Sequence, residues 1–158
     1  MVERWRAPFA SSQAIHQKMS TLARRDTAPE LALRCVLHRR GLRYRVHRRA
    51  LPDLARQADI VFTGAKVAVF VDGCFWHGCP EHGRRHHGVN GWYWPDKIAR
   101  NRTRDLDTTA RLEAEGWRVV RVWEHDLSSP AGTRAVALEI RALWQRATGG
   151  GAPPSGQL

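Results

Sequence analysis

Two cysteines and a histidine stand close together in the middle of the chain, at spacings typical of a metal site. Cys74 and Cys79 are separated by four residues, and His82 follows Cys79 after two more. Thiolate and neutral imidazole are ligands that zinc prefers, and zinc sites often combine such a close pair with a distant partner. We predict that His125, just after a predicted strand, is that partner and that the four hold a structural zinc. The alternative is that they are ordinary loop residues.

Two further residues indicate chemistry at a phosphate. Asp59 lies in a predicted buried strand, where an unpaired carboxylate is costly. Mg²⁺ between Asp59 and a phosphate would offset that cost and act as a Lewis acid, whereas pairing with an arginine would explain Asp59 structurally. His77 could accept a proton from an attacking water. It could equally bind zinc, but the four predicted ligands already complete a tetrahedral set and leave it free.

Large aromatic residues accompany these groups in a polar, glycine-rich stretch. Phe75 and Trp76 lie inside the cysteine segment, and Trp94 follows it. They could fill a small local core. The other interpretation is that they wedge between base pairs, as apolar side chains do in proteins that distort DNA.

The composition favours a folded protein that binds nucleic acid. The 158 residues include 26 Lys+Arg against 15 Asp+Glu, a formal net charge of +11, and 42% are hydrophobic. Such a chain can bury a core, which excludes a wholly disordered basic tail. Residues 34–49 carry seven Arg and two His without an acid, and a second basic face contains Arg100, Arg102 and Arg104. We find no membrane-spanning run or signal peptide and expect a cytoplasmic protein.

The elements that must position these groups follow from periodicity and turn residues. The order predicted is αβββαβα, because helical spacing and caps alternate with β-rich runs. One predicted helix covers about 28–40, a long one begins after Pro95 and ends at Gly116, and a third covers 130–146. The predicted strands cover 42–46, 58–62, 66–71 and 117–123. We expect a single domain over 1–147 and a disordered Gly/Pro/Ser-rich tail over 148–158.

The motifs together resemble one known family. They are Met19, Arg25-Asp26-Thr27-Ala28-Pro29-Glu30, Phe70-Val71-Asp72-Gly73-Cys74-Phe75-Trp76-His77-Gly78-Cys79-Pro80-Glu81-His82, Tyr93-Trp94, Lys97-Ile98, Asn101, Arg104-Asp105, Gly116-Trp117-Arg118-Val119 and Val122-Trp123-Glu124-His125. They look like the very-short-patch DNA mismatch repair endonucleases over roughly residues 16–127. The GCFWHGC core with a later WEH is highly specific.

This resemblance implies an α/β fold of the restriction-endonuclease-like (PD-(D/E)xK) type, with a mixed central sheet flanked by helices and a structural zinc loop. It implies hydrolysis of one DNA strand immediately 5′ of the thymine in a T:G mismatch, the lesion left when 5-methylcytosine deaminates. The implied cofactors are catalytic Mg²⁺ and structural Zn²⁺, and the implied partner is double-stranded DNA with a T:G mismatch. Mismatch-repair proteins are suggested as further partners. We expect a monomer associated with the nucleoid.

The resemblance also carries roles onto individual residues. Asp59 matches the Mg²⁺-binding aspartate, and Val71 would add a metal-facing backbone carbonyl. His77 matches the catalytic histidine. Glu30 matches a glutamate near the active site, although a T-x-x-E capping box would also explain it. The structural zinc set is Cys74, Cys79, His82 and His125. The DNA-intercalating or DNA-binding residues are Phe75, Trp76, Trp94, Met19, Asn101 and Asp105.

The sequence departs from the best-known members in three places. The zinc set has two Cys and two His rather than three Cys and one His, which zinc tolerates. Val71-Asp72 replaces a Thr-His pair, so Asp72 could add a second carboxylate near the metal. Gln57-Ala58 precedes Asp59 where a proline is usual.

Two other functions compete with this interpretation. One is a zinc-stabilised DNA-binding module without activity. The other is a restriction-like nuclease that cuts both strands of undamaged DNA. The presence of both Asp59 and His77 speaks against the binding module.

Overall fold

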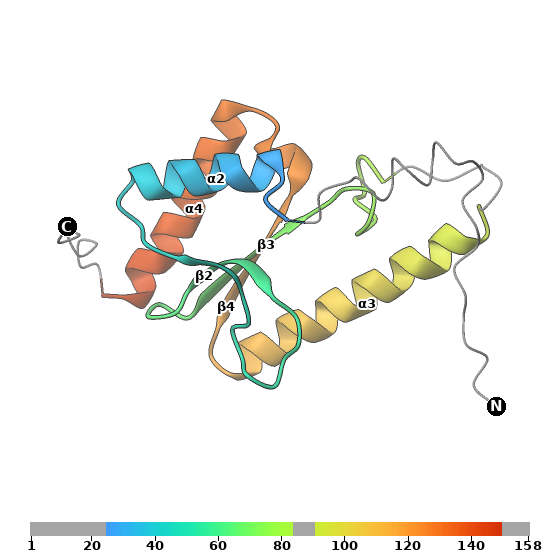
Figure 1. Cartoon of the computed structure of the whole chain (residues 1–158), viewed down its shortest axis with the longest axis horizontal. Coiled ribbons are helices and arrows are strands. Elements are labelled where there is room, and N and C mark those ends of the chain that lie inside the picture. Colours follow the sequence, from blue (N-terminus) through green and yellow to red (C-terminus); the bar gives the residue numbers. More distant parts are fainter. Residues whose placement is uncertain (1–24, 84–90, 150–158) are drawn as a thin grey trace.

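A computed structural model describes residues 25–83 and 91–149, so Met19 and residues 150–158 of the predicted tail lie outside the described part. The elements are α2 (Ala28–Arg39), β1 (Arg45–Arg48), β2 (Ala58–Phe62), β3 (Val67–Asp72), α3 (Tyr93–Ala114), β4 (Arg118–Trp123), the 3-10 helix η1 (Glu124–Leu127) and α4 (Pro130–Ala147) (Figure 1). This order confirms the predicted αβββαβα, with η1 as an addition.

The strands form one mixed sheet in the order β1-β2-β3-β4. The β1-β2 and β2-β3 pairs are antiparallel, and a turn over residues 63–66 joins the second pair as predicted. The β3-β4 pair is parallel, with Val67 opposite Arg118 and Asp72 opposite Trp123. A parallel pair needs a long crossover, which α3 provides.

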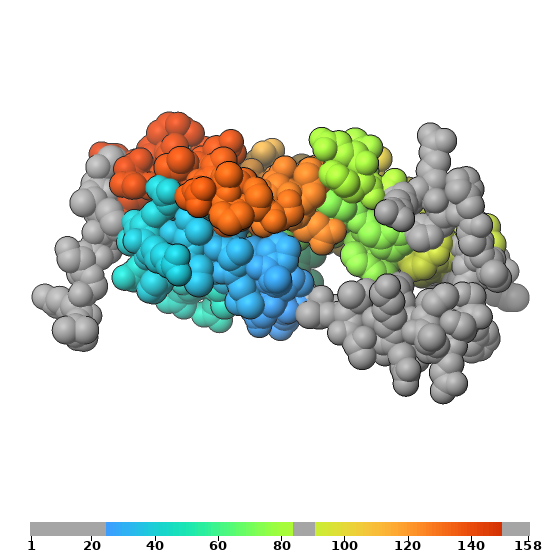
Figure 2. Space-filling view, turned by 90° about the horizontal axis from the view of Figure 1, so that it is seen from above, coloured from blue at the N-terminus to red at the C-terminus, as the bar shows by residue number. Residues whose placement is uncertain are grey.

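Helices cover both faces of the sheet. α2 and α4 lie side by side on one face, as Figures 1 and 2 show, and their apolar side chains pack on β2 and β3. α3 covers the other face, where Leu112 joins Val61, Ala68 and Phe70 in a second core cluster. Because both faces are covered, β2 and β3 are buried along almost their whole length, which explains their continuous apolar sequences.

The first strand begins later than predicted, because Leu42 belongs to the end of α2. Gly41 has a positive φ of 81°, and the Leu42 N–H donates to the Leu37 carbonyl at 3.1 Å while the Gly41 N–H donates to the His38 carbonyl at 3.0 Å. This is the Schellman pattern of helix ends, in which an apolar residue after the glycine packs back on the last turn. Leu42 and Leu37 are accordingly both buried in the same core cluster. The predicted strand over 42–46 is therefore replaced by Arg45–Arg48.

The topology brings several chain segments to one end of the sheet. The carboxyl ends of β3 and β4 lie together because these strands are parallel, so the segment after Asp72 meets η1. β2 runs the other way, so Asp59 near its start lies at this same end. The predicted catalytic and zinc residues of three segments therefore lie together at this end. These segments are the sheet, the loop that follows β3 and η1. None of the described helices has the length and apolarity that crossing a membrane requires.

The packing of α2 on the sheet can be tested with two leucines of the same helix. Leu33 has 0% exposed surface in the core, whereas Leu31 is 48% exposed. Leu33→Ala is expected to lower the free energy of unfolding by about 2–5 kcal/mol, because it leaves a cavity. Leu31→Ala is the matched control and is expected to change it by no more than about 0.5 kcal/mol. Urea denaturation measures both values, and equal losses would contradict this packing.

Candidate active site and metal centre

Asp59 and β3 form the first part of the site. The Val71 N–H donates to Oδ2 of Asp59 at 2.8 Å, and Oδ1 lies 4.0 Å from Nδ1 of His47. His47 stands opposite Asp59 in the β1-β2 register and has a positive φ of 48°, which is strained for a residue with a side chain. His47 was absent from the predicted site. Its sequence position in a basic stretch carries no signal of this placement.

The surroundings of Asp59 fit a divalent cation. Burial raises the pKa of Asp59 to about 6, against the Val71 hydrogen bond, which favours the ionised carboxylate. The charges of Glu30 and Asp72 raise it further. A carboxylate held in this way is stabilised in its ionised form by a cation. In a strand, the N–H and C=O groups of one residue point to the same neighbour. The Val71 carbonyl therefore points to the same side as the Val71 N–H, which donates to Asp59.

Glu30 is buried at the start of α2, and its contacts differ from the expected capping box. Its carboxylate accepts hydrogen bonds from the Asp26 N–H and the Thr27 hydroxyl, both at 3.0 Å, and from Arg34 at 2.9 Å. Thr27 makes no side-chain cap to the helix backbone. The capping-box interpretation is therefore wrong, because the carboxylate bonds one residue further back and to a buried guanidinium. Glu30 is near enough to raise the pKa of Asp59 by its charge.

His77 forms the second part of the site, beside α3. Its Nδ1 lies 2.6 Å from Oδ2 of Asp105 and 3.7 Å from Oδ1 of Asp72. Burial disfavours the charged imidazolium, but the Asp105 hydrogen bond and the two carboxylate charges outweigh it, so the pKa of His77 lies above its usual value. Asp105, predicted as a DNA-binding residue, thus has a defined contact inside the protein.

Asp72 is engaged by an arginine that the sequence interpretation did not include. Nη1 of Arg121 lies 2.9 and 2.8 Å from the two carboxylate oxygens of Asp72, which is 7% exposed. From the sequence, Asp72 was expected to add a second carboxylate near the metal, without a partner inside the protein. Its pairing depends on the β3-β4 register, which places Arg121 two positions before the residue opposite Asp72.

The predicted zinc ligands come together at the end of β3 and in η1. One ligand atom from each of Cys74, Cys79, His82 and His125 lies within 4.8 Å of all the others. Nδ1 of His125 is 3.1 Å from Sγ of Cys74 and 3.6 Å from Sγ of Cys79, and Nδ1 of His82 is 3.9 Å from Sγ of Cys79. Tetrahedral zinc with these ligands sets such separations at roughly 3.4–3.8 Å. The donor set and its spacing therefore fit one zinc ion with four protein ligands.

The loop that carries these cysteines is held by specific contacts. The Cys74 N–H donates to the Glu124 carboxylate at 2.8 Å, which ties the loop to η1. Gly78 has a positive φ of 66°, and a Cβ there would lie 2.7 Å from a methyl group of Ile98. Glycine is thus required at position 78, both by the backbone conformation and by close packing on α3.

The three predicted wedge residues form one aromatic cluster. Ring centroids are 4.8 Å apart for Phe75 and Trp76, 5.1 Å for Phe75 and Trp94, and 5.7 Å for Trp76 and Trp94, all in edge-to-face geometry. The amide of Asn101 donates to the Trp76 carbonyl at 2.7 Å, so Asn101 braces the cluster from α3. All three rings are half-buried, which leaves part of their surface accessible.

The basic residues divide into paired and open groups. Arg34 is buried and bonded to Asp26 and Glu30, so it is not available to a phosphate.

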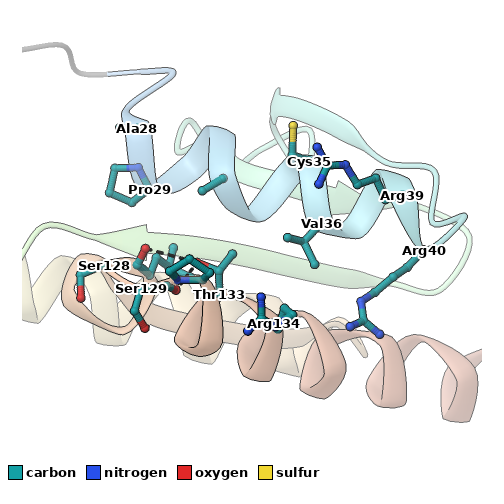
Figure 3. A pocket seen from close by; sticks show the side chains of 13 residues that line it. Ala28, Pro29, Cys35, Val36, Arg39, Arg40, Ser128, Ser129, Thr133 and Arg134 are labelled. Carbon is teal, nitrogen blue, oxygen red and sulfur yellow. Dashed lines mark hydrogen bonds between the residues drawn. The ribbon is translucent and has the colours of Figure 1, made fainter.

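A cavity of about 770 Å³ lies between α2 and α4, lined on its basic side by Arg39, Arg40 and Arg134 (Figure 3). Of the predicted catalytic, zinc and intercalating residues that the structure describes, none lines this cavity.

Several known proteins are similar to this chain in sequence. Residues 11–82 match the family model described as DNA mismatch endonuclease Vsr. The chain is 48% identical over 112 residues to the type II nicking enzyme V.NaeI of Lentzea aerocolonigenes, covering 70% of this chain and 67% of that protein. It is 35% identical over 115 residues to the DNA mismatch endonuclease Vsr of Escherichia coli, covering 68% and 67%.

Among solved structures, the catalytic domain of the homing endonuclease I-Bth0305I superposes with a TM-score of 0.50 at 19% identity, covering 77% of this chain and 98% of that domain. The fold is thus that of a nuclease catalytic domain, consistent with the predicted restriction-endonuclease-like class. The chain belongs to the Vsr family of DNA mismatch endonucleases. It is a DNA endonuclease that acts on phosphodiester bonds, and this class of nuclease implies a divalent metal such as Mg²⁺.

Zinc at the cysteine-histidine cluster can be tested by metal analysis. We expect purified protein to contain about one zinc per chain, because four ligands close the coordination shell. Cys79→Ser is expected to lose most of that zinc and to unfold at a lower temperature. Cys35→Ser is the control, since Cys35 is an exposed free thiol on α2. Zinc bound equally by both variants, measured by mass spectrometry, would contradict the assignment.

Proposed function

We propose that this endonuclease nicks one strand of duplex DNA immediately 5′ of the thymine in a T:G mismatch, in a Mg²⁺-dependent reaction that begins very short patch repair. The observation that carries the proposal is that the Asp59 carboxylate and the His77 imidazole lie at one end of the sheet, beside the aromatic cluster. Its relatives include both mismatch endonucleases and nicking enzymes, which supports cleavage of one strand rather than two.

Asp59 and the Val71 carbonyl would hold the Mg²⁺, with Glu30 close behind them. When bound there, the ion supplies Lewis acid polarisation of the scissile phosphate and stabilises developing charge on oxygen. Asp59 is suited to this role because its carboxylate is partly buried and lies near two other carboxylates. Glu30 is bound to Arg34 and adds negative charge that draws a cation to the site.

His77 is the proton acceptor in this proposal. A carboxylate cannot donate a hydrogen bond, so the contact with Asp105 places a proton on Nδ1 of His77. Nε2 of the neutral imidazole is then free to accept a proton from the attacking water. Asp105 also limits rotation of the ring, which keeps Nε2 aimed in one direction. Asp105 is thus a positioning residue for the chemistry rather than a DNA contact.

Mismatch recognition would come from the aromatic cluster. A wedge of Phe75, Trp76 and Trp94 must unstack a base step, and opening costs least where pairing is already weak. A T:G step is therefore opened more readily than a T:A step. The rings already pack against each other, and Asn101 holds the Trp76 backbone, so little side-chain entropy is lost on insertion. By family resemblance, Met19 would contact the DNA from the opposite groove.

Phosphate contacts would come from the arginines of α3, where Arg102 and Arg104 are exposed and Arg102 lies beside Gly78 of the cysteine loop. Guanidinium groups bind phosphate oxygens in pairs and make affinity depend on salt. The zinc cluster would act structurally, fixing the loop that carries His77 and the wedge. In this way one metal shapes the site and the other takes part in chemistry.

The first experiment measures nicking of end-labelled duplexes that carry a single T:G, beside T:A and C:G controls, with Mg²⁺ or EDTA. A Mg²⁺-dependent nick 5′ of the mismatched thymine supports the proposal. Double-strand breaks in the matched duplexes would indicate a restriction-like nuclease. Binding without a nick in any flanking sequence would indicate a DNA-binding module.

Asp59→Asn tests the metal assignment. We expect the nicking rate to fall by about 10³-fold or more, because the loss of charge removes several kcal/mol of transition-state stabilisation through the ion. Binding of the T:G duplex in EDTA is expected to be retained or slightly improved. Asp53→Asn is the matched control, since Asp53 is 72% exposed and paired with Arg111. Wild-type nicking by Asp59→Asn would exclude Asp59 as the metal-binding residue.

Trp76→Ala tests the wedge. One base–aromatic stacking interaction contributes about 1–3 kcal/mol, so the ratio of T:G to T:A nicking rates is expected to fall about tenfold. Trp92→Ala is the control, because Trp92 is 63% exposed and has its described ring contact with Tyr93, outside the three-ring cluster. If both variants keep the wild-type ratio, mismatch discrimination does not depend on Trp76.

A further inference from the structure

Arg121 occupies a central place beside the proposed active site. It lies on β4 opposite Phe70 of β3, and its guanidinium carbon sits 4.6 Å from the centroid of the Phe70 ring. From there Nη1 reaches both oxygens of Asp72, at 2.9 and 2.8 Å. The stacking and the pairing fix the guanidinium at the end of the sheet.

The other side of the same guanidinium faces α3. Nη2 lies 3.4 Å from Oδ1 of Asp105 and donates to the Asp105 backbone carbonyl at 3.3 Å, while Nε donates to the Thr109 hydroxyl at 3.2 Å. The remaining carboxylate oxygen of Asp105 is the one that bonds His77. Arg121 thus connects β3, β4 and α3 through one planar group.

The charges explain why a cation is needed there. Asp72 and Asp105 both approach Nδ1 of His77, at 3.7 and 2.6 Å, and both are largely shielded from solvent. Two carboxylates this close repel each other unless a cation lies between them. Arg121 is the guanidinium that contacts both among the described residues. Without it, Asp105 would be pushed away from its position beside the imidazole.

We propose that Arg121, anchored by Asp72, is a positioning residue for DNA nicking that holds the Asp105 carboxylate against Nδ1 of His77. The inference rests on the proposed role of His77 in nicking. It also gives Asp72, which stands where the best-known family members have a histidine, a purpose in this chain. Asp72 anchors Arg121, and Arg121 orients Asp105, which in turn orients His77.

The test compares single-turnover nicking of the T:G duplex with equilibrium binding of that duplex in EDTA. Arg121→Gln is expected to slow nicking about 10–100-fold, the usual effect of removing a supporting contact behind a reacting group, and to change Kd by less than about threefold. Arg121→Lys keeps the charge and is expected to recover part of the rate. Arg118→Gln is the matched control on β4, because Arg118 is exposed and bonds the Leu143 carbonyl.

A double-mutant cycle shows whether Arg121 acts through Asp105. The Asp105→Ala/Arg121→Gln variant is expected to nick no more than about threefold slower than Asp105→Ala alone, since the two residues form one unit. Multiplied effects, or a loss of DNA affinity that matches the loss of rate, would overturn the proposal. So would a wild-type rate in folded Arg121→Gln.

Removal of one charge from a shielded pair can unfold a protein, so Asp72→Asn/Arg121→Gln is the second variant. It removes the charges of Asp72 and Arg121 together, so the repulsion between Asp72 and Asp105 is also lost. It is still expected to nick slowly, because the contacts of Arg121 with the Asp105 carboxylate and backbone carbonyl are gone. A wild-type rate in this double variant would overturn the proposal.

An independent measurement needs no activity. In the ¹H–¹⁵N NMR spectrum of the free protein, the His77 Nδ1–H resonance is expected far downfield in wild-type and Arg118→Gln protein. In Arg121→Gln it is expected to shift upfield or to exchange away. If the wild-type protein does not nick T:G duplexes, the proposed function fails. If the wild-type protein nicks them but the His77 resonance is unchanged in Arg121→Gln, only the inference about Arg121 is rejected.

Discussion

The parallel pairing of β3 with β4 is the constraint on which the rest of the site depends. The α3 crossover sets both strands in the same direction, so the segments that follow them leave the sheet side by side. Cys74 and His125, 51 positions apart, can therefore lie within 3.1 Å of each other. The same pairing brings Arg121 to Asp72. An antiparallel arrangement would send the two segments to opposite ends and separate both pairs.

Local patterns in the sequence were sufficient to predict most of the elements and the proximity of Cys74, Cys79 and His82. Continuous apolar runs indicated β2 and β3, and glycine at the helix ends indicated where α2 and α3 stop. The cysteines are close in sequence, so their proximity required no knowledge of the fold. The beginning of β1 was predicted too early because Leu42 is apolar in either role. Only the Schellman hydrogen bonds to the end of α2 distinguish a helix-end residue from a strand residue.

The supporting residues of the site could not be predicted, because their positions depend on strand register. Arg121 reads as one of 26 basic residues in the sequence, and His47 as part of a basic stretch. Both acquire their contacts from neighbouring strands. Glu30 shows the related difficulty that a T-x-x-E pattern fits a helix cap equally well. Arg34, four residues later and buried, is what draws the carboxylate away from that role.

Two aspartates at neighbouring strand ends show how environment divides the work. Asp72 is paired with a guanidinium through both oxygens, so its charge is compensated inside the protein. Asp59 is half-buried, receives one backbone N–H, and its pKa is raised to about 6 mainly by burial. A carboxylate already matched by an arginine has little to gain from a metal, whereas one held without such a match gains a great deal. Asp59, which has no arginine partner among the described residues, is thus the aspartate that we propose binds the catalytic cation.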